Sequence, residues 1–227
     1  MINRCSNNDI SLLSLEIDLT DKKRSGKLSG CTYGDKLTTK KRITAISGST
    51  RERSTNLNLI HAIGGFSADR FEIEVFRGLM DIPPFSPDND NESAGHHVAE
   101  FRQMLRDADG VLICTPEYAM GVPGTLKNAI DWTVSSAEFS HKPTALITAS
   151  SIGEKGHASL LETLRIIEAN IPDETQLLIS HAKLKVSNDY EITDEKTLGA
   201  NLKLIIAFDE LIDTAQKAGY AAQVRSQ

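Results

Sequence analysis

The sequence predicts an α/β fold: a doubly wound, five-stranded parallel sheet with helices on both faces. Five short apolar segments alternate with five amphipathic ones along residues 42–219, which is the pattern of strands joined by crossover helices. The segments at 110–118 and 143–150 are apolar almost throughout, as strands are when helices cover both faces of a sheet. Since no internal repeat or second apolar core interrupts the pattern, one folded domain is expected.

The expected elements begin and end at recognisable residues. The first strand ends at Gly48, and the following helix places Leu57, Ile60 and Ile63 on one face before Gly64, where a C-terminal glycine is expected to end it. A loop rich in proline and acidic residues spans 81–90. The expected strands are residues 42–48, 70–78, 110–118, 143–150 and 176–182, and the expected helices are 54–65, 96–109, 122–137, 157–170 and 194–219.

Charge is unevenly distributed along the 227 residues. Residues 1–41 hold eight Lys/Arg and five Asp/Glu, a net charge of +3 against −6 for the whole chain, so the remainder carries the difference, −9. An acidic body argues against binding to a nucleic-acid backbone. Residues 1–40 are predicted to be a flexible extension, with a basic binding arm as the alternative, and residues 41–227 are predicted to form the folded domain.

Several classes of protein are disfavoured by composition. Three cysteines without a C-x-x-C pair indicate a reducing compartment, so a cytoplasmic location is expected and a disulfide or zinc framework is not. No membrane span is expected, because no apolar run approaches ~18 residues. The six histidines lack metal-ligand spacing, so no metal is expected. Cys114 and Trp132 are predicted in the core, and Lys127 with Asp131 as a surface pair.

Three loops rich in small or polar residues follow three of the strands, at residues 48–56, 115–124 and 149–156. The carboxyl ends of parallel strands meet at one edge of the sheet, where ligands bind near the point of strand-order reversal. In the first loop, hydroxyls, arginines and the start of a helix suit a bound anion. The alternative is that Ser54 or Thr55 only caps the helix and that the arginines are solvated.

The second and third loops suit a flat ring. Pro116 and Pro123 stiffen the second loop, and Tyr118 offers an aromatic surface. A rigid loop presenting backbone N–H and C=O groups fits a heteroaromatic ring with polar edges, although an ordinary turn with a half-buried Tyr118 is the alternative. Ser151 and Gly153 in the third loop would let such a ring approach the backbone, or they form only a turn.

The residues of the first two loops resemble those of the NADPH-dependent FMN reductase family, flavodoxin-like proteins that include chromate, quinone and azo-dye reductases. The family's first loop reads G-S-x-R-x-x-S-x-N, and residues 48–56 match it at Gly48, Ser49, Arg51, Ser54 and Asn56. Its second loop reads T-P-E-Y-N followed by P-G-x-L-K-N-A-I-D-W, and residues 115–118, 123–124 and 126–132 match. The resemblance covers about residues 42–220 and implies a flavodoxin-like fold for the domain at 41–227.

The resemblance also implies how FMN would be held. The first loop would bind the phosphate, residues 116–119 would line the ribityl chain and the isoalloxazine ring, and the third loop would close over the ring. The FMN-binding residues implied in this way, with the neighbouring Thr55, are Ser49, Arg51, Ser54, Thr55, Asn56, Pro116, Glu117, Tyr118, Ala119, Ser151 and Gly153.

The implied activity is that of an FMN-dependent NAD(P)H oxidoreductase, with NADPH or NADH as co-substrate and a quinone or similar small acceptor (chromate, azo compounds or free flavin). Because the flavin N5 would carry the hydride, no catalytic side chain is expected. Assembly as a homodimer or homotetramer is also implied. The alternative is an FMN-binding electron carrier or redox sensor that acts on a protein partner.

The sequence departs from the family pattern at four positions. Ala119 stands where the family has Asn, which removes a side-chain amide near the flavin. Ile152 and His157 replace a Pro or Met and a Gly in the third loop, and His141 replaces a Gly before Lys-Pro. The departures at the second and third loops are expected to alter ring contacts or substrate access more than flavin binding.

Overall fold

The computed structural model describes residues 39–91 and 93–225, and for residues 220–225 only the backbone. The predicted N-terminal extension at 1–40 lies outside the described residues except for its last two, so both the extension and the domain boundary stay predictions. Within the described part of the chain, no helix is long and apolar enough to cross a membrane.

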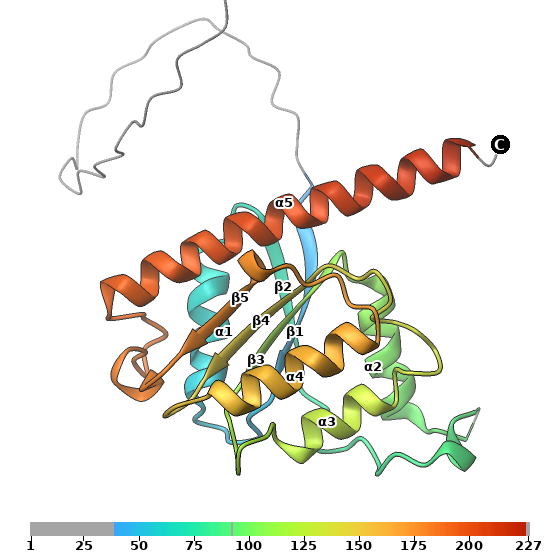
Figure 1. Cartoon of the computed structure of the whole chain (residues 1–227), viewed down its shortest axis with the longest axis horizontal. Helices are drawn as coiled ribbons and strands as arrows, with labels where there is room; N and C mark the ends of the chain where they lie inside the picture. The colour runs from blue at the N-terminus through green and yellow to red at the C-terminus, as the bar shows by residue number, and fades with distance from the viewer. Residues whose placement is uncertain (1–38, 92, 226–227) are drawn as a thin grey trace, which may run out of the picture. The chain divides into compact units, whose positions relative to one another are not determined.

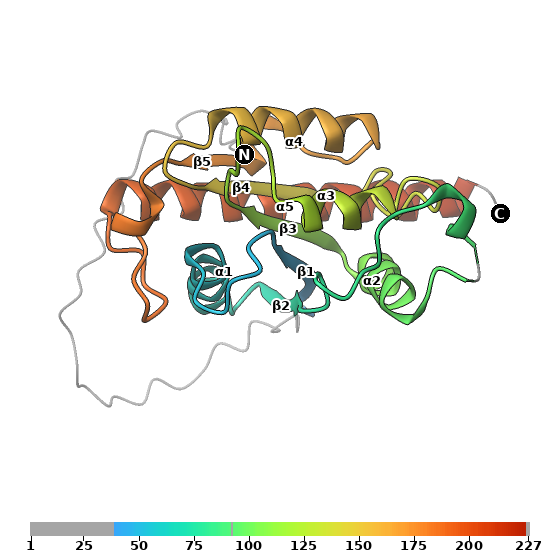
Figure 2. The same cartoon turned by 90° about the horizontal axis from the view of Figure 1, so that it is seen from below.

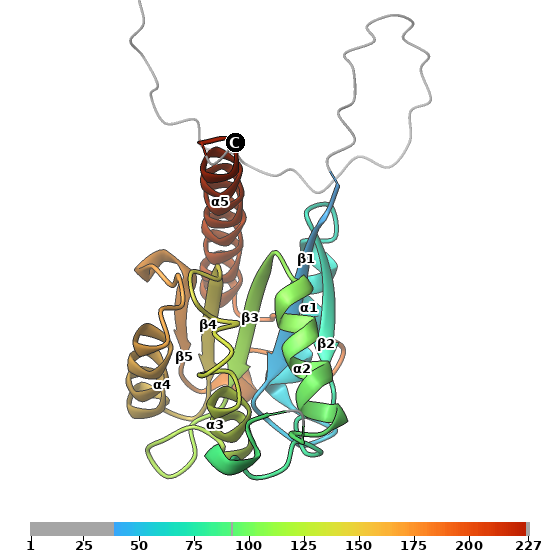
Figure 3. The same ribbon diagram turned by 90° about the vertical axis from the view of Figure 1, so that its right-hand side faces the viewer.

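Five parallel strands form one sheet in the order β2-β1-β3-β4-β5, which Figure 3 shows from right to left. The order reverses between β1 and β3, which are neighbours in the sheet although β2 lies between them in the sequence. The predicted fold class is therefore confirmed. The strands are β1 (Lys41–Ser47), β2 (Phe71–Phe76), β3 (Gly110–Thr115), β4 (Thr144–Ala149) and β5 (Gln176–Ile179).

Helices cover both faces of this sheet. In Figure 2, α1 and α2 lie on opposite sides of β1 and β2, and α5 runs past the end of the sheet in Figure 1. The helices are α1 (Thr55–Phe66), α2 (His96–Asp107), α3 (Gly124–Asp131), α4 (Glu154–Ile166) and α5 (Glu195–Arg225), with short 3₁₀ turns η1 (Pro87–Asn89), η2 (Asp173–Thr175) and η3 (Ala182–Leu184).

The core has two layers, one on each face of the sheet. Phe101 of α2, Leu126 of α3 and Leu164 of α4 pack on one face, and Ile60 of α1 and Phe208 of α5 pack on the other. Both β3 and β4 are buried along their whole length, as their continuous apolar sequences predicted. Burial of apolar surface on both faces of the sheet stabilises the strands. The loops that follow these strands therefore start from well-defined positions.

Ion pairs fasten α5 to the beginning of the sheet. The ammonium of Lys41, at the start of β1, lies 2.5 Å from a carboxylate oxygen of Asp209 and 2.6 Å from one of Asp213. Arg70, just before β2, also contacts Asp209 at 2.9 Å. These contacts lie at the amino edge of the strands, the opposite edge from the three loops.

The expected helix boundaries need correction at several places. Helix α1 does not end at Gly64 but continues to Phe66, because Ser67 provides the cap: its N–H and its hydroxyl both donate to the Ile63 carbonyl, at 3.0 and 2.7 Å. Helix α3 already ends at Asp131, α4 begins at Glu154 rather than 157, and α5 continues to Arg225.

The α3 segment that carries much of the family motif also holds the loop between β2 and α2. The Asn128 amide accepts a hydrogen bond from the Phe85 N–H at 2.7 Å. The indole N–H of Trp132 donates to the Pro83 carbonyl at 2.8 Å, and the ring meets Phe85 edge-on. Trp132 is 1% exposed, which confirms its predicted place in the core.

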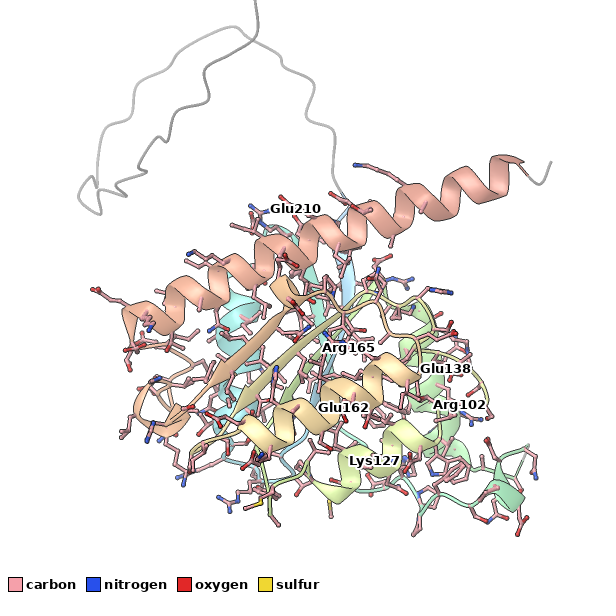
Figure 4. The ribbon with its side chains drawn as sticks, in the orientation of Figure 1. Arg102, Lys127, Glu138, Glu162, Arg165 and Glu210 are labelled. Carbon is pink, nitrogen blue, oxygen red and sulfur yellow. The ribbon has the colours of Figure 1, made fainter. Side chains whose placement is uncertain are left out.

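The outer surfaces of α3 and α4 are charged. Lys127, Glu162 and Arg165 are exposed and are labelled in Figure 4. Lys127 pairs with Asp131 one turn along α3, 2.5 Å away, as the four-residue spacing predicted. Such exposed ion pairs contribute little to the free energy of folding.

Candidate active site

The loops after β1, β3, β4 and β5 line one pocket of about 550 Å³ at the carboxyl edge of the sheet. Three of these loops were expected to meet there. The lining residues are Ser49, Arg51, Arg53, Ser54, Thr55, Asn56, Pro116, Glu117, Tyr118, Ala149, Ser150, Ser151, His181, Ala182, Lys183 and Leu184.

Nine of the eleven residues expected to bind FMN line this pocket, and Ala119 and Gly153 do not. Ala119 is exposed and has a positive φ of 49°, because it lies in a tight turn closed by mutual hydrogen bonds between the backbones of Tyr118 and Gly121, both 2.9 Å. Gly153 has φ 99°, and a Cβ there would lie 2.7 Å from a methyl carbon of Leu178. Gly153 therefore lies against the sheet and starts α4.

Gly48, the first residue of the first loop, lies in close contact with Thr115 at the end of β3. A Cβ at Gly48 would lie 2.8 Å from the Cβ of Thr115 at the end of β3. The Gly48 N–H continues the pairing of the two strands by donating to the Cys114 carbonyl at 2.8 Å. Gly48 is therefore required for packing between the first and second loops.

The start of α1 offers free donors to the pocket. Ser54 is the cap: its hydroxyl oxygen accepts from the Asn56 N–H at 3.2 Å. The backbone N–H groups of Ser54 and Thr55 donate to no acceptor among residues 39–91 and 93–225. The helix cap predicted as the alternative is thus present, and it coexists with unpaired N–H groups that suit an anion.

Asn56 joins the first loop to the third. Its side chain is almost completely buried, at 3% exposed, and its amide nitrogen donates to the Ala149 carbonyl at the end of β4, 3.2 Å away. Its amide oxygen is buried and has no partner among the described residues. A buried acceptor without a donor is costly, so this atom indicates a place for a ligand hydrogen bond.

Glu117 joins the second loop to α4. One of its carboxylate oxygens accepts from the Gly156 N–H at 2.7 Å. Close packing permits this contact, because a Cβ at Gly156 would lie 2.8 Å from the Gly121 carbonyl oxygen. The carboxylate is therefore held at the first turn of α4, where the helix dipole favours negative charge.

The fourth wall of the pocket, after β5, was not expected from the sequence. His181 has φ 55° and its N–H donates to the Ser151 carbonyl at 3.1 Å, while the Ala182 N–H donates to the Ser150 carbonyl at 3.0 Å. These bonds bring Lys183 to the pocket. The carboxyl-edge rule applied to the first, third and fourth strands applies equally to β5, and it would have found this segment.

The pocket carries unbalanced positive charge. Arg51, Arg53 and Lys183 line it, and none of them forms an ion pair with a carboxylate in the described part of the chain. The whole chain is acidic, with a net charge of −6. A local cluster of cations on an acidic protein attracts a small anion specifically to this place.

Burial shifts the pKa values of two titratable groups outside the pocket lining. His157 Nδ1 and the Thr148 hydroxyl are 2.9 Å apart, and burial lowers the pKa of His157 below its ordinary value of 6.5. Cys114 is completely buried at the end of β3, as predicted, and burial raises the pKa of its thiol. Among the described residues, no group of three or more His, Cys, Asp or Glu side chains is placed to hold a metal ion.

The model of a known family, described as NADPH-dependent FMN reductase, matches residues 41–183, which is more than half of the chain. The chain belongs to this family. Membership in this family confirms the predicted cofactor and the predicted enzyme class: the protein is an NAD(P)H-dependent flavoprotein oxidoreductase. It also confirms the resemblance that the loop motifs indicated.

Individual members of the family are similar over most of their length. The NADH-dependent flavin reductase subunit 2 of Lactobacillus johnsonii is 32% identical over 188 residues, which cover 78% of this chain and 100% of that protein. The quinone reductase of Escherichia coli K12 is 30% identical over 181 residues, 76% of this chain and 96% of that protein.

Solved structures agree with the family assignment. FerB of Paracoccus denitrificans, a flavoenzyme NAD(P)H:(acceptor) oxidoreductase, superposes with a TM-score of 0.70 at 26% identity and covers 77% of this chain and 98% of that chain. An archaeal flavodoxin, at 12% identity and a TM-score of 0.51 over 76% of this chain and 99% of that one, shares the fold.

Proposed function

We propose that this FMN reductase family member binds FMN in the pocket at the carboxyl edge and passes reducing equivalents from NADPH or NADH to quinones or similar small acceptors. The observation that carries the proposal is the pocket itself, where nine residues expected to bind FMN meet around unpaired cations and free N–H groups. The 2-hydroxy-1,4-benzoquinone reductase of a Burkholderia species, 32% identical over 69% of this chain and 87% of that protein, supports the choice of acceptor.

The first loop fits a phosphate monoester. The N–H groups of Ser54 and Thr55 lie at the N-terminus of α1, which is the positive end of the helix dipole, and Arg51 adds a guanidinium that can bind two phosphate oxygens at once. The hydroxyl of Ser49 provides a further donor. These donors match an anion of two negative charges better than they match any neutral group.

The second and third loops fit the flavin ring. Pro116 is buried and rigid, Tyr118 is 44% exposed, and Ser151 of the third loop also lines the pocket. When bound, FMN supplies the hydride and electron transfer chemistry. The chain's own task is then to position the ring, to leave room for a flat acceptor beside Tyr118, and to hold the Glu117 carboxylate against the Gly156 N–H.

Purified full-length protein tests this proposal directly. We expect it to bind FMN and to oxidise NADPH or NADH when a quinone is added. Arg51→Ala should weaken FMN binding about 10- to 100-fold, because a charge-assisted hydrogen bond contributes about 1.5–3 kcal/mol. Lys127→Ala, which removes an exposed charge on α3, is the matched control and should change nothing. Failure to bind FMN, or an unchanged affinity in Arg51→Ala, contradicts the assignment.

Assembly and location are further parts of the proposal. The loops that form the pocket carry exposed apolar side chains at Tyr118, Met120, Ile152 and Leu184, which are 44–81% exposed, and exposed apolar surface favours association between copies. This supports a homodimer or homotetramer, which light scattering of the eluting protein would measure. A cytoplasmic location is supported by the free, buried thiol of Cys114.

A further inference from the structure

Lys183 brings a positive charge to the pocket from a wall that belongs to neither loop motif. The residue lies in the turn η3 after β5, is exposed, and lines the pocket. Its ammonium forms no ion pair with a carboxylate among residues 39–91 and 93–225. The next residue, Leu184, also lines the pocket and is 81% exposed. One short turn therefore presents a free cation and a bare apolar side chain in succession.

The backbone holds this turn against the third loop. Three hydrogen bonds of 2.9–3.1 Å run from residues 180–182 to the carbonyl groups of residues 150–152. Ala182, inside the turn, is 2% exposed and packs into the core. Lys183 is therefore held beside the loop that is expected to close over the flavin ring, where a second ligand of the pocket would enter.

The cations of the pocket exceed what a single phosphate requires. A phosphate monoester carries about −1.5 to −2 charges at neutral pH. Arg51, Arg53 and Lys183 together carry three positive charges, and the N-terminus of α1 adds about +0.5. The first loop alone supplies two guanidinium groups and the free N–H groups of the helix start. Lys183 is therefore available to a second anion.

The second anion that this oxidoreductase must receive is a nicotinamide dinucleotide. NADPH differs from NADH only by a 2′-phosphate on the adenosine, which adds about 1.5–2 negative charges. An ammonium pairs with phosphate oxygens, and an exposed apolar side chain offers a surface to the adjoining purine. Membership in the family does not by itself choose between the two nucleotides, because the Lactobacillus relative is NADH-dependent.

We propose that Lys183 pairs with the 2′-phosphate of NADPH while Leu184 packs against its adenine, so that the wall after β5 makes the protein select NADPH over NADH. This inference rests on the proposed function and names its electron donor. It also gives a role to the one pocket wall that the loop motifs leave unexplained.

Calorimetric titration of the FMN-loaded full-length protein with NADP⁺ and NAD⁺ tests the inference without catalysis. The wild type should bind NADP⁺ about tenfold more tightly than NAD⁺. Lys183→Ala should weaken NADP⁺ about tenfold, the scale of one lost charge-assisted hydrogen bond, and leave NAD⁺ and FMN unchanged. With a quinone as acceptor, KM for NADPH should rise by the same factor while kcat is retained. Lys183→Arg should keep most of the NADP⁺ affinity, because a guanidinium also pairs with phosphate.

Lys185→Ala is the matched control. Lys185 lies two residues further along and does not line the pocket, so its removal changes the net charge equally and should leave both nucleotides unchanged. Leu184→Ala should weaken NADP⁺ and NAD⁺ by one common factor, because both nucleotides carry the adenine.

The other patterns overturn the inference. If Lys183→Ala weakens FMN, the ammonium belongs to the flavin phosphate; if it weakens both nucleotides equally, it contacts the pyrophosphate that they share. If it changes neither, or if the wild type binds both nucleotides equally, the ammonium selects nothing. If Leu184→Ala changes neither, the adenine lies elsewhere. All of these results leave FMN binding, and with it the proposed function, intact, whereas a chain that binds no FMN overturns both.

Discussion

At the scale of single residues, Glu117 shows how a negative charge is accommodated beside a pocket that is otherwise cationic. Its carboxylate is not free to meet an anionic ligand, because it accepts a hydrogen bond from the Gly156 backbone at the first turn of α4. The same bond fixes the second loop relative to the third. The residue therefore acts through position, and its effect on a ligand passes through the loops it joins.

Glu117→Ala should lower the free energy of unfolding by about 1–2 kcal/mol and weaken FMN binding, because the link between the second loop and α4 is lost. Glu117→Gln keeps an amide oxygen in the same place and should retain most of both properties. Urea unfolding monitored by the fluorescence of Trp132 measures the stability, and flavin titration measures the affinity. If Gln behaves like Ala, negative charge rather than the hydrogen bond is what matters.

At the scale of elements, two glycines near α1 have opposite roles. Gly48 lies where β1 approaches Thr115, and no side chain fits there. Gly65 lies inside α1 near its end, is exposed, and a Cβ there would meet no atom within 4 Å. The sequence alone suggested that the helix ends at the pair Gly64 and Gly65, whereas Ser67 caps it.

Substituting alanine at these two positions should therefore shift stability in opposite directions. Gly48→Ala should destabilise the fold by about 1–3 kcal/mol through steric overlap. Gly65→Ala should stabilise it by about 0.5–1 kcal/mol, because alanine loses less backbone entropy in a helix. Thermal unfolding of the two variants side by side checks this. A loss of stability in Gly65→Ala would mean that the helix ends at the glycine after all.

The sequence predicted those elements and loops that are encoded by a short continuous run of residues. The apolar runs of β3 and β4 predicted both strands and their burial, and the loop motifs predicted most of the pocket. The wall formed by His181 and Lys183 was missed because its residues match no motif, although the carboxyl-edge rule applied to β5 would have found the segment. The Asn56–Ala149 contact joins residues 93 positions apart, and no local pattern encodes such a distance.

At the scale of the whole molecule, the pH dependence of folding follows from groups that the fold buries. His157 is held close to Thr148 and its pKa is lowered by desolvation, so the folded chain binds a proton there less readily than the unfolded chain does. The unfolded chain therefore takes up more protons as the pH falls through about 6.5, and the free energy of unfolding decreases with it.

We expect urea unfolding at pH 5.5 to give a lower stability than at pH 7.5, and we expect His157→Gln to reduce that difference. The contribution of His157 is fully present above its unfolded pKa and is lost as the pH falls below it. His96→Gln is the control, because that imidazole is exposed at the start of α2. An identical pH dependence in wild type and His157→Gln contradicts the prediction.

The ion pairs of Lys41 with Asp209 and Asp213 lie at the amino edge of the sheet, and every pocket loop lies at the carboxyl edge. Mutations in the pocket loops that change the preferred electron acceptor can therefore accumulate at the carboxyl edge without breaking the ion pairs that hold α5 at the amino edge. Loop positions whose side chains form none of the bonds between the loops can therefore vary without loosening this attachment. Tyr118, Lys183 and Leu184, which line the pocket, are such positions and are the first candidates for directed evolution of substrate range.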